Sequence, residues 1–144
     1  MARYVTLIQS PWKPEVAFAY MADLRNFVQW DPGVRRVSQL SGSAGGAGAV
    51  FEVVVAGIGR GLPLRYTTTV YEEPERLTIT ATTRRLTSID TISVAADQPN
   101  GSVVSYEAQL LLNGPLHVFD VLLKPFFDRI AERAASGLRL VLGR

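Results

Sequence analysis

Residues 116–141 read LHVFDVLLKPFFDRIAERAASGLRLV, and this stretch decides the fold that the sequence predicts. Its apolar residues recur at steps of three and four, and most of its charged residues fall on the opposite side. This spacing predicts an amphipathic helix with a wide apolar face. A continuous helix of this length would extend about 40 Å. Pro125 lies inside it and removes one backbone hydrogen bond, so we expect a kink or a break there.

The region before this helix consists of short alternating segments separated by turn residues. Loop 41–48 is rich in Gly, Ser and Ala and predicts a flexible hairpin loop, while 57–61 and 97–101 predict turns. Successive strands joined by short turns predict an antiparallel meander with one buried face. We expect its strands at residues 34–40, 50–56, 64–72, 77–83, 87–95 and 102–112.

The first thirty residues predict one more strand and two short helices. Residues 4–9 form a β-rich run, and residues 13–28 have helical spacing with Pro14 near their start, where a missing N–H is tolerated. Asp23 is expected to divide this segment because its side chain can cap a second helix. The sequence Trp30-Asp31-Pro32-Gly33 then ends helix formation, since Pro32 favours an extended Asp31.

This order of elements predicts an α+β fold with an internal cavity. The apolar face of a meander must be covered, and the C-terminal helix is the element long enough to cover it. A twisted sheet of six to seven strands tends to curl, so a straight helix cannot contact its whole width. The gap would be a cavity that the two short helices close at one end. The alternative is that Phe and Leu side chains fill the space.

Length and composition restrict the class of protein. The 144 residues are expected to form one domain, 1–144, and 47% hydrophobic with 19% charged residues is typical of a globular chain. The net charge is +2 with scattered Lys and Arg, which argues against a nucleic-acid partner. No apolar run reaches about 20 residues, so stable membrane insertion is not expected. The N-terminus lacks a signal-peptide pattern, so a cytoplasmic protein is predicted. We expect a monomer or a weak homodimer.

Several kinds of catalytic and cofactor site are excluded. There is no cysteine, and His117 is the single histidine, so neither a metal centre nor a catalytic triad is expected, and His117 is assigned a surface or capping role. Glycines 57, 59 and 61 and loop 42–48 lack the Gly-Lys-Ser/Thr ending of a phosphate loop. They are interpreted as turns that could gate the cavity. No cofactor is predicted.

A few polar and aromatic residues fall on the expected inner face. Tyr66 and Thr68 share a strand face with Leu64 and Val70, and Tyr106 falls on the apolar face of the last strand. The tyrosine hydroxyls could orient a polar group of a ligand or bond the backbone as core residues. Asp90 points inward in the register that buries Ile92 and outward in the register that buries residue 89, and the outward register is preferred. If inward, a buried Asp90 needs a partner, for which Arg85 is the candidate.

The candidate catalytic residues are accordingly Asp90, Arg85, Tyr66 and Tyr106, and no metal ligand is proposed. In the last helix, the apolar residues from position 119 to 130 are expected to line the floor of the cavity, and Trp30 is expected near its mouth. The candidate ligand contacts are Trp30, Phe51, Val53, Tyr66, Thr68, Ile79, Ile92, Tyr106, Phe119, Leu123, Phe126, Phe127 and Ile130.

The sequence also resembles a known family. Residues 10–26 (SPWKPEVAFAYMADLRN) and 30–34 (WDPGV) are similar to the start of SRPBCC, or START-like, proteins, in particular the polyketide cyclase/dehydrase-like branch. Residues 71–77 (YEEPERL), 101–106 (GSVVSY) and the closing helix with Gly137-Leu138 extend the resemblance over nearly the whole chain. It implies a helix-grip (START/Bet v 1-like) fold with a deep apolar pocket.

Three functions remain open. The first is binding or carriage of a small hydrophobic molecule, such as a lipid, quinone, sterol or polyketide-like compound. The second is a cyclase, aromatase or dehydratase that uses the cavity tyrosines and possibly Asp90 and Arg85, because such reactions depend on positioning and one or two acid–base groups. The third is an interaction module with a filled core. We rank binding first, the enzyme second and the interaction module third.

Overall fold

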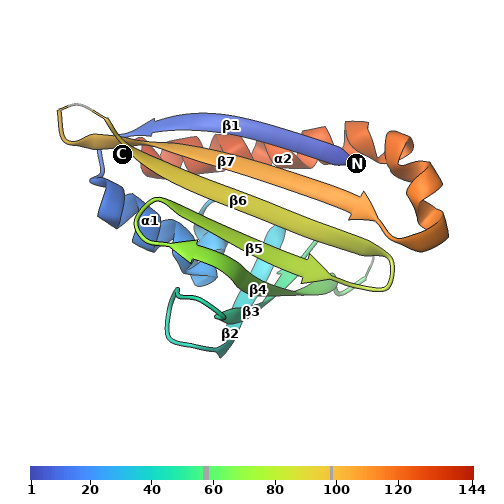
Figure 1. The fold of residues 1–144 in the computed structure, drawn as a ribbon. Helices are drawn as coiled ribbons and strands as arrows, with labels where there is room; N and C mark the ends of the chain where they lie inside the picture. The colour runs from blue at the N-terminus through green and yellow to red at the C-terminus, as the bar shows by residue number, and fades with distance from the viewer. Residues whose placement is uncertain (57–58, 98) are drawn as a thin grey trace.

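The structure, a computed structural model, describes residues 1–56, 59–97 and 99–144, and in it a curved seven-stranded antiparallel sheet carries helices on one face (Figure 1). The strand order is β1-β7-β6-β5-β4-β3-β2. All neighbours except β1 and β7 are consecutive in sequence, so the sheet is a meander with its first strand added beside its last. The helix-grip fold expected from the sequence is confirmed.

The elements have the following bounds. The strands are β1 (Ala2–Ser10), β2 (Val34–Ser41), β3 (Val50–Val55), β4 (Leu62–Glu72), β5 (Arg76–Thr82), β6 (Leu86–Asp97) and β7 (Gly101–Leu112). The helices are α1 (Pro14–Ala22), the 3-10 helices η1 (Leu24–Gln29) and η2 (Gly114–Phe119), and α2 (Asp120–Leu142). Each expected strand is present. In the predicted turns 57–61 and 97–101, residues 57, 58 and 98 lie outside the described residues.

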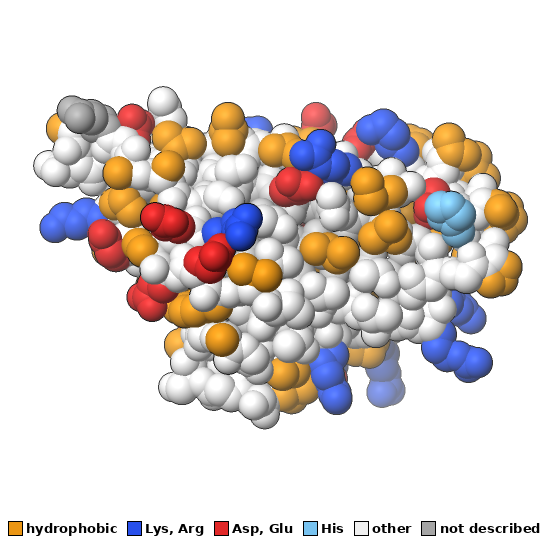
Figure 2. All heavy atoms as spheres, in the orientation of Figure 1, with side chains coloured by type: hydrophobic (Ala, Val, Ile, Leu, Met, Phe, Trp, Pro, Cys, Tyr) orange, Lys and Arg blue, Asp and Glu red, His pale blue; other side chains and the backbone are white. Residues whose placement is uncertain are grey.

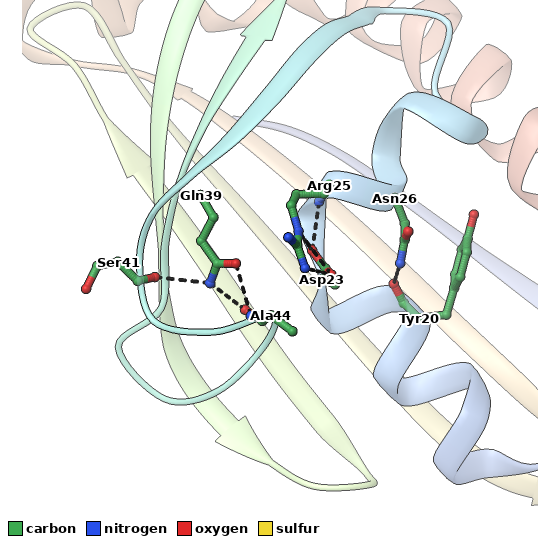
Figure 3. Close-up of polar contacts among 7 residues, drawn as sticks. All are labelled: Tyr20, Asp23, Arg25, Asn26, Gln39, Ser41 and Ala44. Atoms are coloured by element: carbon green, nitrogen blue, oxygen red, sulfur yellow. Dashed lines mark hydrogen bonds and ion pairs between the residues drawn. The ribbon is translucent and has the colours of Figure 1, made fainter.

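Asp23 separates the two short helices, as the sequence predicts. Its Oδ1 accepts a hydrogen bond from the backbone N–H of Arg25 at 3.1 Å, which caps η1, and its Oδ2 accepts from the Arg25 guanidinium at 2.7 Å. Asn26 Nδ2 donates to the carbonyl oxygen of Tyr20 at 3.0 Å and so joins the end of α1 to η1 (Figure 3). These bonds hold the two helices as one bent unit over the end of the sheet.

The loop between β2 and β3 is fastened by a single side chain. Gln39 Nε2 donates to the carbonyl oxygens of Ser41 and Ala44, and Gln39 Oε1 accepts from the Ala44 N–H at 3.0 Å (Figure 3). The loop lies against α1, because a Cβ built on Gly45 would come within 2.8 Å of the Ala22 Cβ. This loop, expected as a possible gate, therefore rests on the α1 end of the molecule.

The hydrophobic core fills the α1 end of the space between helices and sheet. Phe18 and Met21 of α1, Phe51 of β3 and Leu138 and Leu142 of α2 are all completely buried there. Gly137 lets α2 approach closely, because a Cβ on it would overlap the carbonyl oxygen of Trp30. Arg139 also donates to the hydroxyl of Thr6 in β1 at 2.9 Å. The C-terminal half of α2 is thus bound tightly to the sheet and to the loop after η1.

Of the kink or break expected at Pro125, the break does not occur. The α-helix continues through Pro125, and the change in helix type falls instead between η2 and α2 at Phe119 and Asp120. Proline removes one donor near the start of the helix, and the remaining bonds sustain it. Asp120 secures the boundary, because its Oδ1 accepts from the N–H of Leu112 at 3.0 Å at the end of β7.

We expect Gly137→Ala to lower the free energy of unfolding by about 2–3 kcal/mol, because the added methyl group must displace the Trp30 backbone or α2 itself. The measurement is denaturant unfolding followed by circular dichroism. Ser136→Ala, at the exposed neighbouring position of the same helix, is the control and should change stability little. Equal stability of the two variants would contradict the close contact.

Candidate functional site

A pocket of about 380 Å³ lies between the sheet and the middle of α2. Ile130 and Arg133 of α2 line it and are solvent-exposed, so they mark its mouth. The interior is mainly apolar, with a small group of polar side chains. The lining comprises Asp31, Pro32, Gly33, Val55, Ala56, Leu62, Leu64, Tyr66, Leu86, Ser88, Asp90, Tyr106, Ala108, Leu110, Phe127, Ile130, Ala131, Arg133 and Ala134.

Short side chains keep this half of the interior open. Ala108 of β7 and Ala131 and Ala134 of α2 line the pocket with methyl groups only. One to two turns further along α2, Leu138 and Leu142 fill the corresponding space with complete burial. The same helix therefore closes the core with leucines and leaves a hollow with alanines.

Tyr66 of β4 and Ser88 of β6 form the first polar pair of the pocket. Their hydroxyl oxygens are 2.6 Å apart, and both residues are buried. The two strands are not neighbours, since β5 lies between them. The β5 residue that pairs with Ser88 is the small residue Ala81. Ala81 thus leaves room for the tyrosine ring to reach across. Burial, the charge of Asp90 and the field of Asp31 raise the pKa of Tyr66, so the phenol stays protonated.

Asp90 of β6 and Tyr106 of β7 form the second pair. The Tyr106 hydroxyl donates to Asp90 Oδ2 at 2.7 Å. Burial is the main reason why the pKa of Asp90 rises to about 7; the charge of Asp31 adds to the rise, and the bond from Tyr106 offsets part of it. Burial and the neighbouring Asp90 raise the pKa of Tyr106. Asp90 therefore exchanges its proton near neutral pH while Tyr106 remains a donor.

The sheet register places Asp90 inside, against the outward register that the sequence favoured. Asp90 is opposite Ile79 of β5 and Ala108 of β7, and Ile79 is completely buried. Directly paired residues share a face of the sheet, so Asp90 must point inward with them. The proposed partner Arg85 is exposed and lies outside the pocket lining; Tyr106 contacts Asp90 instead.

Asp31 is the fourth acidic or phenolic group of the pocket lining with a raised pKa, and the sequence reasoning did not select it as a site residue. Burial raises its pKa, and a hydrogen bond from the Gly33 N–H to Asp31 Oδ1, 2.8 Å long, partly offsets this. The signal available in the sequence was the Asp-Pro-Gly turn, in which an aspartate folds back on its own backbone. Ser88 was missed as well, although the inward register of Ile92 also implies it.

The structure brings five of the candidate residues together in the pocket and places the others elsewhere. Tyr66, Asp90, Tyr106, Phe127 and Ile130 line it. A second set is packed into the filled core at the α1 end, outside the pocket lining: Trp30, Phe51, Val53, Ile79 and Ile92. Thr68 is buried without a hydrogen-bond partner for its hydroxyl and does not line the pocket.

The expected pocket floor is corrected at the start of α2. Phe119 is 51% and Phe126 67% exposed, and Leu123 is half-buried without lining the pocket. Figure 2 shows hydrophobic side chains gathered around the histidine at this end of the molecule. η2 and the start of α2 extend beyond the sheet (Figure 1), so their apolar residues have no strand to cover. Exposed large apolar residues in this stretch are Leu116, Val118, Phe119, Val121, Leu122 and Phe126.

His117 lies outside the pocket. Its Nδ1 contacts Asp120 Oδ2 at 2.8 Å, and its side chain is exposed. Within residues 1–56, 59–97 and 99–144, no three His, Asp, Glu or Cys side chains are grouped to hold a metal ion. In the same described part of the chain, no helix is both long and apolar enough to cross a membrane.

The fold agrees with comparisons to known proteins. The model of a family described as "Polyketide cyclase / dehydrase and lipid transport" matches residues 1–143. The fold is similar to that of a START superfamily protein from Mycobacterium smegmatis, with 13% identity, a TM-score of 0.72 and coverage of 99% of this chain and 97% of that chain. A search of curated proteins found no match.

Two further solved structures extend this similarity. The protein XoxI from Bacillus cereus has 18% identity and a TM-score of 0.71, with 99% of this chain and 96% of that chain covered. The major latex-like protein 151 from Panax ginseng has 12% identity and a TM-score of 0.60, with 92% and 97% covered. At these identities the likeness concerns the fold.

The chain belongs to the polyketide cyclase/dehydrase and lipid transport family of SRPBCC, START-like proteins, because the family model matches almost its entire length. Members of this family commonly bind hydrophobic ligands. The resemblance seen in the sequence is thereby confirmed.

We expect the free energy of unfolding to fall as the pH rises from about 4 to about 7, and Asp90→Asn to weaken this dependence. Folded Asp90 keeps a proton that the unfolded chain releases near its ordinary pKa of 3.8. Above pH 7 the variant should be more stable than the wild type by about 1–3 kcal/mol. The raised pKa of Asp31 acts in the same direction, so the Asp90→Asn variant should retain a smaller dependence of stability on pH. Urea unfolding between pH 4.5 and 8.5 measures the effect.

Carboxyls with lowered pKa, such as Asp23, Glu107 and Asp120, do not produce this trend. Their stabilisation is lost only as the pH falls below ordinary carboxyl pKa values. Asp128→Asn, which removes an acid from an ion pair outside the pocket, is the matched control. If Asp90→Asn keeps the full wild-type slope, Asp90 does not retain its proton in the folded protein.

Proposed function

We propose that this protein binds or carries a small hydrophobic molecule in the pocket between α2 and the sheet. The single observation that supports this most is the pocket itself, which at about 380 Å³ falls within the roughly 300–1,000 Å³ typical of small-molecule sites. The interaction-module alternative assumes a filled interior, and a pocket of this size argues against it.

The lining favours a ligand with an apolar body and one polar group. Leu64, Leu86, Leu110 and Phe127 offer hydrocarbon surface along two sides of the pocket. Burying apolar ligand surface against them stabilises the complex by about 25 cal/mol per Å² before the entropic cost of association. The hydroxyls of Tyr66 and Ser88 and the Asp90–Tyr106 pair would orient the polar group. This combination is characteristic of sites that select by shape and one or two hydrogen bonds.

Native mass spectrometry after gentle purification tests the proposal directly. We expect an additional mass that disappears on organic extraction, and displacement of an apolar fluorescent probe by the extracted compound. Absence of a bound mass together with no binding of any probe from an apolar panel would refute the proposal.

Ala131→Phe should weaken probe binding strongly, since the ring would enter the pocket from α2. We expect at least a tenfold rise in Kd, equivalent to about 1.4 kcal/mol, with an unchanged circular dichroism spectrum. Ser136→Phe, on the exposed side of the same helix and outside the pocket, is the control. Equal affinities of both variants and the wild type would place the probe elsewhere.

A second candidate function, acid–base catalysis at the same site, is favoured by one observation. Asp90 has a pKa of about 7 and touches the Tyr106 hydroxyl, so the pair could transfer a proton at neutral pH. A cyclisation or dehydration of a polyketide-like substrate needs such a group beside an oriented carbonyl.

If the protein is such an enzyme, Asp90→Asn should reduce kcat about 100-fold or more on a cyclisable poly-β-ketone. The wild-type rate should change with an apparent pKa near 7, which the variant would lack. Tyr106→Phe should reduce the rate and move the apparent pKa of the profile upward, because Asp90 loses the hydrogen bond that lowers its pKa. Unchanged turnover in both variants would eliminate this candidate.

A further inference from the structure

Two carboxyl groups face the same apolar pocket from different elements. Asp90 lies on β6, and Asp31 lies in the turn between η1 and β2. The hydrogen-bond donors that reach them, Tyr106 for Asp90 and the Gly33 N–H for Asp31, are both neutral. Each bond stabilises a carboxylate without cancelling its charge. The charge of Asp31 is felt by Asp90, where it raises the pKa further than burial alone.

No cationic side chain neutralises these acids in the described part of the pocket. Its titratable groups are Asp31, Tyr66, Asp90, Tyr106 and Arg133. Arg133 is exposed at the mouth, and neither its charge nor any other cation contributes to the pKa shifts of the two acids. Both tyrosines remain neutral, since their pKa values are raised. The ionised pocket is therefore negative and lacks an internal counter-charge.

We propose that the pocket selects apolar ligands that carry a protonated amine and discriminates against carboxylate ligands of the same shape. This rests on the proposed function and assigns the chemical class of its ligand. A buried carboxylate without a cation is costly, and an ammonium group at hydrogen-bond distance from Asp90 would supply the missing charge. A carboxylate ligand would instead add a third negative charge in a medium where like charges repel strongly.

The size and lining of the pocket suit a ligand with such a head. The neutral donors Tyr66, Ser88 and Tyr106 can remain bonded to their present partners while the ammonium group approaches the free side of Asp90. The apolar body then lies along Leu86, Leu110 and the α2 side chains that line the pocket. Binding of the cation lowers the pKa of Asp90, so uptake of the amine near pH 7 releases a proton.

Three probes with one apolar body test this preference by isothermal titration calorimetry. They are 2-naphthylmethylamine, which is cationic, 2-naphthalenemethanol, which is neutral, and 2-naphthoate, which is anionic. At pH 8 we expect the amine to bind about tenfold more tightly than the alcohol, as for a hydrogen bond to a charged group, and the naphthoate to bind most weakly. At pH 5.5, where Asp90 is protonated, the preference should shrink.

Two pocket variants and one control locate the effect. Asp90→Asn should remove most of the amine preference, measured within each variant as the ratio of the amine and alcohol affinities, because it removes the negative charge and nearly keeps the shape of the side chain. Asp31→Asn should reduce this ratio less. Asp128→Asn makes the same charge change outside the pocket and should retain the wild-type order of affinities. Thermal melts of each variant establish that it is folded.

The outcomes separate this inference from the proposed function. Binding of none of the three probes would argue against an apolar-ligand site and would remove the charge preference with it. Equal affinities for all three, or tightest binding of the naphthoate, would overturn the charge preference and leave the apolar site standing. An amine preference that persists in Asp90→Asn and Asp31→Asn alike would also overturn it.

Discussion

The close approach of α2 to the Trp30 carbonyl at Gly137 is the constraint on which the rest of the structure depends. It brings the helix backbone against the turn after η1 and allows Leu138 and Leu142 to be completely buried. A straight helix that is held tightly at one end of a curved sheet cannot also lie against the other end. The hollow lined by Ala131 and Ala134 follows from this geometry and from their short side chains.

The polar groups of the pocket reduce the stability of the fold, and in the function proposed above they provide chemical selectivity. Asp90 and Tyr66 are buried among apolar residues, where a hydrocarbon side chain would avoid the cost of desolvation. Each is held by one short hydrogen bond with a residue of another strand, and this fixes its orientation before any ligand arrives. A site that is arranged in advance loses less entropy on binding. Destabilising groups of this kind are typical of functional sites.

The comparisons fit this division between frame and pocket. Solved structures at 12–18% identity are similar to this chain in fold. At such identities the pattern of apolar and turn residues maintains the fold, whereas individual side chains set what each pocket accepts. The negative charge in the pocket of this chain comes from two residues, Asp31 and Asp90.

The sequence alone determined the order and type of the elements, because alternation, helical spacing and caps such as Asp23 are local signals. It also brought Tyr66 and Tyr106 to the inner face. The tertiary structure decided the rest. Pairing with the buried Ile79 turned Asp90 inward, and α2 extends past the sheet, which leaves Phe119 and Phe126 exposed. Periodicity defines which residues share a face of a strand or helix, but the face that is buried, and how completely, depends on contacts between segments far apart in the chain.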